Sequence, residues 1–161
     1  MSDPRATVER FYECFAKRDA EGMVACYAPN VRFSDPVFVD LSPDEARAMW
    51  RMLISRGKDT KIQHTGVEVD ASGASGSAKW VATYTFSQTG NFVRNEVSSH
   101  FRFDGDKIID QHDTFDFWKW AGQALGLPGK LLGWAPPFQN ALRKKARGSL
   151  EAFMKKESAK S

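Results

Sequence analysis

Two aspartates stand where a carboxyl group could act as an acid or a base. Asp35 ends a short alternating run and precedes a proline. Asp113 has the same parity as Gln111 and Phe115 in a later alternating run, so these three side chains share one face of a strand. An apolar pocket raises the pKa of a carboxyl group, and two facing carboxyl groups separate their pKa values. If both line one pocket, one can donate a proton and the other can accept one near neutral pH.

Each of the two aspartates also has a structural explanation, which the sequence leaves open. An aspartate before proline can accept backbone N–H hydrogen bonds in an Asx turn, and Asp35 fits that pattern. Asp113 could instead be a buried acid that is paired with Arg32, Arg102 or His112.

Other kinds of chemistry find little support in the residue types. No histidine has a partner at the helical i, i+4 spacing that metal sites use, and His100 and His112 have the opposite parity to Asp113. We therefore expect these two histidines on the outer face of a sheet or under a helix. Cys14 and Cys26 are too few for a disulfide scaffold or a zinc site, and we expect them to be core thiols. No glycine-rich phosphate loop or nucleophile elbow is present, and the sequence predicts neither a metal nor a cofactor.

The composition is that of one folded domain. The chain has 161 residues, of which 42% are hydrophobic and 12% aromatic, and this excludes disorder of the whole chain. It has no apolar run of about 18 residues, so we expect no transmembrane helix. The charged N-terminus lacks the apolar stretch of a signal peptide, and we therefore expect a cytoplasmic protein.

The net charge of +3 is unevenly distributed. Residues 141–161 hold seven lysines and arginines against two glutamates. A nucleic-acid binder spreads its basic charge over a groove or patch, so we predict no nucleic-acid partner. The basic end is either a solvated helix face or a contact for an anionic surface.

The first part of the chain predicts helices around one short strand. Apolar spacing predicts a helix over Pro4–Arg18 with Asp3 as its N-cap, and a second over about Ala20–Tyr27. A break at residues 28–30 precedes a strand over Val31–Asp35. A cap at Ser42 opens a helix that runs to about Arg56.

Four alternating runs follow and predict antiparallel strands. They cover Lys61–Val69, Ser77–Ser87, Phe92–Phe103 and Lys107–Phe117, and turn residues separate them. This order predicts an α+β fold in which a curved antiparallel sheet and the N-terminal helices enclose a cone-shaped pocket. Residues 1–117 form this domain, and residues 118–161 form a C-terminal helical extension of it.

The extension is rich in tryptophan, leucine, glycine and proline. We expect a short helix to about Leu125, a turn over Lys130–Gly133 and a final helix to about Lys156. This segment either packs on the sheet or completes a dimer. Alternatively, its apolar and basic residues lie on a membrane surface.

The segment YAPNVRFSDP, from Tyr27 to Pro36, carries a family resemblance. It resembles the signature "Tyr-Ala, two residues, strand, Asp-Pro" of ketosteroid isomerases. The wider group is the nuclear transport factor 2-like superfamily, with SnoaL-type polyketide cyclases and limonene epoxide hydrolases. The order of the predicted elements matches over residues 5–117.

The resemblance implies roles for several residues. Asp35 takes the place of the base that moves a proton in ketosteroid isomerases. The oxyanion tyrosine falls on Phe11, and the next residue, Tyr12, is turned by about 100° on a helix, so we expect that Tyr12 does not substitute for that tyrosine. The second oxyanion donor falls on Ser99. The segment from Gln111 to Asp116 resembles the acid-bearing strand of limonene epoxide hydrolases and places Asp113 on the acid.

Aromatic residues supply the remaining expected contacts. Trp50 stands on the helix that covers the pocket mouth in this superfamily, and we expect it to touch a ligand. The further residues predicted to bind a ligand are Phe11, Tyr12, Trp80, Ser99, Phe101 and Phe115. Tyr84, Phe86 and Trp118 are the other aromatic residues expected in the pocket and core.

Two functions fit these expectations. The first is a cofactor-free pocket enzyme, of the isomerase, cyclase or hydratase type, that acts on a small apolar ring compound through Asp35 and Asp113. The second is a non-catalytic ligand-binding or scaffolding module. An enzyme needs a pocket carboxyl with a shifted pKa, whereas a binding module predicts that Asp35 is held in a salt bridge. Relatives often dimerise through the sheet face, so we expect a homodimer.

Overall fold

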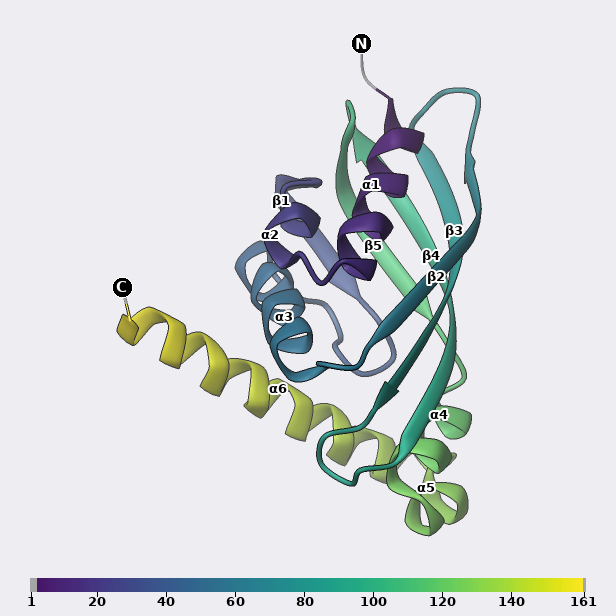
Figure 1. Cartoon of the computed structure of the whole chain (residues 1–161), viewed down its shortest axis with the longest axis vertical. Coiled ribbons are helices and arrows are strands. Elements are labelled where there is room, and N and C mark those ends of the chain that lie inside the picture. Colours follow the sequence, from purple (N-terminus) through teal and green to yellow (C-terminus); the bar gives the residue numbers. More distant parts are fainter. Residues whose placement is uncertain (1–2, 161) are drawn as a thin grey trace.

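The computed structural model describes residues 3–160, in which a curved five-stranded sheet wraps around helices on its inner face (Figure 1). The helices are α1 (Pro4–Ala16), α2 (Ala20–Val24), α3 (Pro43–Arg56), α4 (Phe117–Leu125), α5 (Leu127–Leu132) and α6 (Pro136–Lys160). The strands are β1 (Tyr27–Ser34), β2 (Lys61–Val69), β3 (Ser75–Thr85), β4 (Phe92–Asp104) and β5 (Lys107–Thr114). The predicted α+β fold is confirmed.

The sheet has the order β1-β5-β4-β3-β2 and does not close into a barrel. The four consecutive strands β2 to β5 pair antiparallel, as the alternation predicts. Strand β1 pairs parallel with β5, the last strand of the chain, so β1 and β2 form the two edges. This pairing brings the segment of Asp35 beside the strand of Asp113.

The boundary between α2 and β1 differs from the prediction. The helix ends at Val24 rather than Tyr27, and the strand begins at Tyr27 and runs through Pro29. The proline is tolerated because β1 is an edge strand whose register shifts between Tyr27 and Arg32. The expected break is therefore an irregular part of the strand, and the Tyr27 side chain lies in the core.

Side-chain caps fix where the main helices start. Asp3 accepts a hydrogen bond from the Ala6 backbone N–H, which confirms the predicted N-cap of α1. Ser42 and Glu45 form a capping box at the start of α3, in which each side chain accepts from the other residue's backbone N–H. These caps orient the two helices that fill the concave side of the sheet.

Several predicted ends shift by a few residues. Strand β5 ends at Thr114 instead of Phe117, because Asp116 accepts from the Lys119 backbone N–H and starts α4. Helix α1 ends at Ala16, strand β3 covers Ser75–Thr85, and β4 continues to Asp104. Helix α5 spans Leu127–Leu132, and α6 continues past the expected end to Lys160.

The C-terminal extension packs on the domain along part of its length. Trp120 and Ala121 of α4 pack with Val93 of β4 in a small separate core. Helix α6 passes below α3 and then continues away from the body of the protein (Figure 1). Among the described residues, no helix has the length and apolar character needed to cross a membrane. Dimerisation through the sheet stays a prediction.

Leu150 provides a test of how α6 is held. Its side chain is 0% exposed, so Leu150→Ala should leave a cavity and lower the free energy of unfolding by about 2–4 kcal/mol. The matched control Leu131→Ala removes the same atoms from a side chain that is 61% exposed and should cost less than about 0.5 kcal/mol. Chemical denaturation measures both, and equal costs would contradict the packing described for α6.

Candidate active site

A cavity of about 260 Å³ lies between the concave face of the sheet, α3 and α6. Its walls are mostly aromatic and aliphatic, with Phe15, Trp50, Trp80 and Phe115 among them. Pockets of this kind take apolar ligands and orient them with a few polar groups. Four charged side chains contribute to the wall, and they are Asp35, Asp113, Arg56 and Lys145.

Asp35 reaches the cavity from the loop that follows β1. Its Oδ1 atom accepts hydrogen bonds from the backbone N–H groups of Val37 and Phe38, at 2.7 and 2.6 Å. This is the Asx turn that the Asp-Pro sequence predicts. The turn fixes the carboxyl group through one oxygen, and no group of residues 3–160 donates to Oδ2. The structural role and an acid–base role are therefore compatible in Asp35.

Asp113 lies deeper, at the end of a chain of hydrogen bonds that begins on α1. Its cross-strand neighbour on β4 is Ser99. The Ser99 Oγ accepts from the Tyr12 hydroxyl at 2.7 Å and from the Trp80 indole N–H at 2.8 Å. The hydroxyl hydrogen of Ser99 is thereby left for Asp113, and this hydrogen bond lowers the pKa of Asp113.

A second chain of donors reaches Asp113 from the opposite side. The Trp50 indole N–H donates to the Tyr27 hydroxyl, and that hydroxyl donates to Gln111 Oε1, both at 2.7 Å. The Gln111 amide then donates to the two oxygens of Asp113, at 3.1 and 3.3 Å. Both chains therefore end on the same carboxyl group, which is 2% exposed.

Burial makes both carboxyl groups weaker acids than usual. Burial raises the pKa of Asp35 to about 6, against a partial lowering by the two backbone N–H groups. Burial, with a smaller contribution from the negative charge of Asp35, raises the pKa of Asp113 to about 7, against a partial lowering by the hydrogen bonds from Ser99 and Gln111. No ion pair among residues 3–160 involves either aspartate. The alternative partners for Asp113 are engaged elsewhere or exposed, since Arg32 pairs with Asp40.

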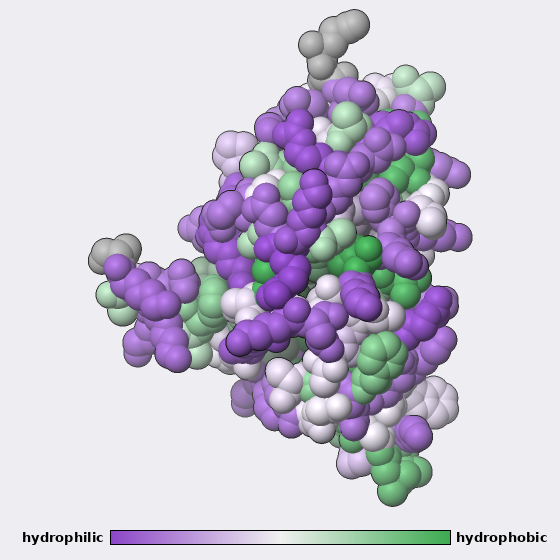
Figure 2. Space-filling view, viewed as in Figure 1, coloured by the Kyte–Doolittle hydropathy of each residue, from purple (hydrophilic) through white to green (hydrophobic). Residues whose placement is uncertain are grey.

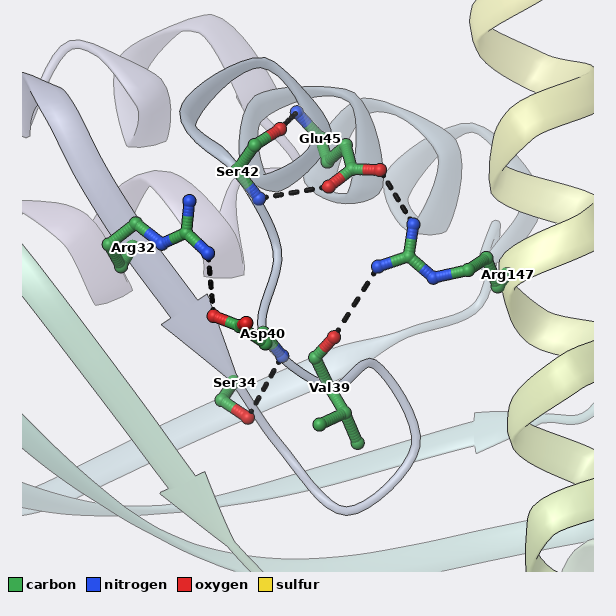
Figure 3. Close-up of polar contacts among 7 residues, drawn as sticks. All are labelled: Arg32, Ser34, Val39, Asp40, Ser42, Glu45 and Arg147. Carbon is green, nitrogen blue, oxygen red and sulfur yellow. Dashed lines mark hydrogen bonds and ion pairs between the residues drawn. The ribbon is translucent and has the colours of Figure 1, made fainter.

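Helix α6 holds the loop that carries Asp35. Arg143 donates to the Pro36 carbonyl at 2.8 Å. Arg147 pairs with Glu45 at 2.7 Å and donates to the Val39 carbonyl at 3.4 Å (Figure 3). The same close-up shows the Asp40 backbone N–H donating to Ser34. The loop is thus tied to α3, β1 and α6, and the carboxyl of Asp35 has a fixed support.

The predicted ligand-binding residues divide into two groups. Trp50, Trp80 and Phe115 line the cavity together with the two aspartates. Phe11, Tyr12, Ser99 and Phe101 are almost fully buried behind the wall and contribute no surface to it. The Tyr12 side chain is buried with Phe11 against the concave sheet and does not reach the cavity, so a role at a ligand stays a prediction. The Tyr12 hydroxyl instead reaches Ser99, the position of the second oxyanion donor.

The sequence does not predict the polar roles of Tyr27, Gln111 and Tyr84, or the buried place of Trp120. The sequence predicts Tyr27 at the end of a helix. Gln111 is predicted to share a strand face with Asp113, and this shared face is the sequence signal for its contact with that carboxyl group. The Tyr84 hydroxyl lies at the cavity wall and accepts from the Trp120 indole N–H at 2.8 Å, so its own hydrogen is free for a ligand. Trp118, expected in the pocket or core, is 51% exposed, and Trp120 takes that place.

Metal ligation has no counterpart in the described part of the chain. Residues 3–160 contain no cluster of three or more His, Cys, Asp and Glu side chains that could hold a metal ion. His100 and His112 face each other across β4 and β5 and are exposed, which confirms their predicted place on the outer face.

The raised pKa of Asp113 predicts an unusual dependence of stability on pH. Between the ordinary carboxyl pKa of 3.8 and the folded value of about 7, the unfolded chain loses a proton that the folded chain keeps. Stability from this group is therefore complete at low pH and is lost as the pH rises toward neutrality. Relative to wild type, the midpoint temperature of thermal unfolding of Asp113→Asn should therefore rise by roughly 10 °C between acidic and mildly alkaline pH.

The control for this prediction is a carboxyl group with the opposite shift. Hydrogen bonds from Ser72 and Ser75 lower the pKa of the exposed Asp70 to about 2. Asp70→Asn should therefore lose stability relative to wild type as the pH rises. A parallel pH dependence in Asp113→Asn and wild type would show that Asp113 ionises normally in the folded protein.

Comparison with known proteins agrees with this architecture. The model of the SnoaL-like domain family matches residues 8–111. No curated protein matches the sequence. Among solved structures, a nuclear transport factor 2-like protein of unknown function from Burkholderia pseudomallei is 21% identical, with a TM-score of 0.67 over 77% of this chain and 98% of that one.

Two other solved structures are of named enzymes. IdmH, a putative polyketide cyclase from Streptomyces antibioticus, is 18% identical, with a TM-score of 0.64 over 78% of this chain and 99% of its own. SalBIII, an epoxide hydrolase/cyclase-like enzyme in pyran ring formation of salinomycin, is 13% identical, with a TM-score of 0.62 over 70% and 90%. At such identities these structures share the fold alone. With the family model covering most of the domain, this chain belongs to the SnoaL-like domain family of the nuclear transport factor 2-like superfamily.

Proposed function

We propose that the protein is an enzyme that transfers protons on a small apolar ring compound through Asp35 and Asp113. The observation that carries this proposal is the pair of carboxyl groups with raised pKa values in one largely apolar cavity. Neither is neutralised by a cation among residues 3–160. A binding module, by contrast, would gain nothing from two costly buried carboxyl groups at its ligand.

Asp35 is the base of the proposed reaction. With a pKa of about 6, it is mostly ionised at neutral pH and can still accept a proton. The Asx turn holds Oδ1, so Oδ2 is the oxygen that takes the proton. The loop contacts of Arg143 and Arg147 keep this oxygen in place when a ligand enters.

Asp113 is the acid. Its pKa of about 7 lies above that of Asp35, so it keeps its proton longer as the pH rises. The donors behind it, Ser99 and Gln111, occupy the inner side of the carboxyl group. The proton of Asp113 is thus available on the cavity side, and the Tyr84 hydroxyl is a second donor on the same wall.

These roles define one reaction class with several outcomes. Asp35 removes a proton from a carbon beside a ligand carbonyl, and the electron pair moves into an enol whose oxygen receives the hydrogen bond or proton of Asp113. Return of the proton to another carbon completes an isomerisation. Attack of the enol carbon on a second carbonyl of the ligand closes a ring. The structural similarity to IdmH, a putative polyketide cyclase, and to SalBIII, an epoxide hydrolase/cyclase-like enzyme, supports this class.

The walls indicate the ligand. Their aromatic side chains favour a flat or ring-shaped apolar compound. The volume of about 260 Å³ exceeds the ~150 Å³ of a cavity that holds one benzene, so the ligand is larger than a single ring.

Removing the base should remove the first chemical step. The measurement is hydrogen–deuterium exchange beside the carbonyl of a bicyclic ketone such as 2-tetralone in heavy water, followed by NMR. Wild type should accelerate the exchange, and Asp35→Asn should lower its kcat/KM by about 100-fold or more. Asp110→Asn is the matched control, because this carboxyl group lies on β5 with the opposite parity to Asp113. Tight binding of the ketone without exchange in wild type would instead support the binding module.

The two carboxyl groups should also set the pH profile of this exchange. The rate needs Asp35 ionised and Asp113 protonated, so kcat/KM should rise through about pH 6 and fall through about pH 7. In Asp113→Asn the group at this position no longer titrates, and the falling limb should disappear while the rising limb stays. A falling limb that persists in Asp113→Asn would assign the acid to another group.

A further inference from the structure

We propose that the end of the molecule formed by α4 and α5 is a docking surface for an anionic lipid membrane. The docking surface consists of six exposed apolar side chains, and these are Phe92, Trp118, Leu127, Leu131, Leu132 and Trp134. Of the large hydrophobic side chains that are exposed in residues 3–160, only Val39 and Leu53 lie elsewhere. This proposal does not depend on the proposed enzymatic function.

The docking surface is continuous around α5. Leu127 and Leu131 are one helical turn apart and are 66% and 61% exposed. Trp118 donates its indole N–H to the Lys130 carbonyl, and Trp134 donates to the Leu131 carbonyl, both at 2.9 Å. The two indoles therefore flank α5 with their polar N–H groups satisfied. Figure 2 shows hydrophobic side chains at the lower tip of the molecule, where Figure 1 places α5.

The backbones of α4 and α5 are closely packed under the docking surface. A side-chain carbon at Gly129 would lie 1.9 Å from the Ala121 carbonyl oxygen, so α5 rests directly on α4. With α4 fixed to the sheet by Phe117 and Trp120, the apolar side chains of α5 point outward from a rigid support. An exposed apolar patch on a well-packed support marks an interaction site.

The charges around the docking surface indicate the partner. The charged residues of α4 and α5 are two lysines, Lys119 and Lys130, and these helices contain no aspartate or glutamate. Lys119 and Lys130 lie in the same shallow groove as Phe92 and Trp118, where the carboxyl of Asp116 is the N-cap of α4. A second copy of this chain would place these cations against themselves in a two-fold contact. An anionic bilayer instead offers phosphates to the lysines, an interfacial zone to the tryptophans and acyl chains to the leucines.

The test is sedimentation of the whole protein with vesicles. We expect binding at low salt to phosphatidylcholine vesicles that contain one third phosphatidylglycerol, and little binding to pure phosphatidylcholine. Lys119→Gln together with Lys130→Gln should weaken binding by about 30-fold, since each lysine near the membrane surface strengthens it about fivefold. The matched control, Lys155→Gln with Lys156→Gln, removes the same charge from the exposed far end of α6 and should bind like wild type.

A second variant tests the apolar half of the docking surface. Leu127→Gln with Leu131→Gln should weaken vesicle binding by at least about tenfold, whereas Val39→Gln, a half-exposed site outside the docking surface, should not change it. Unchanged thermal unfolding shows that each variant is folded. Absence of binding to the anionic vesicles, equal binding to neutral ones, or equal loss in the lysine control would overturn the proposal. A dimer in gel filtration that Leu127→Gln with Leu131→Gln dissociates would also overturn it, because the docking surface would then be a self-interface.

Discussion

The structure is arranged around a buried carboxyl group, Asp113, that has hydrogen-bond donors instead of a cation. Ionisation of such a group inside a protein is costly, and hydrogen bonds to it offset part of that cost. Ser99 and Gln111 donate directly, and Tyr12, Trp80, Tyr27 and Trp50 stand behind them as further donors. These residues come from α1, α3 and four of the five strands. A single titratable group therefore constrains how most of the domain packs.

The same constraint separates the tasks of the two aspartates. Asp35 is held by backbone N–H groups of its own loop, and this local support depends on α6 through Arg143 and Arg147. Asp113 is held by side chains that are distant in the sequence. The loop can thus present a fixed oxygen to a ligand, while the core retains a proton. Helix α6 contributes part of the cavity wall, so the extension after β5 belongs to the pocket as well as to the outer surface.

Local patterns predicted what depends on neighbours in the sequence. The caps at Asp3 and Ser42, the Asx turn of Asp35 and the inward parity of Asp113 all follow from a few adjacent residues. The sequence does not predict the hydrogen bonds Tyr27–Gln111 and Tyr12–Ser99, because the partners are 84 and 87 residues apart. No local spacing encodes such pairs. The place of Tyr27 in a strand is also difficult to predict, because Pro29 is typical of a break between elements but is tolerated in an edge strand.

The proposed mechanism requires that Asp113 keeps its proton near neutral pH while Asp35 releases its proton at a lower pH. A carbon-13 NMR titration of the aspartate carboxyl groups tests it most directly, with Asp35→Asn and Asp113→Asn to assign the signals. We expect two signals that titrate near pH 6 and pH 7. In Asp35→Asn the pKa of Asp113 should be lower, because a neighbouring negative charge is gone. If both signals titrate near the ordinary carboxyl value of 3.8, the acid–base account of this pocket is wrong.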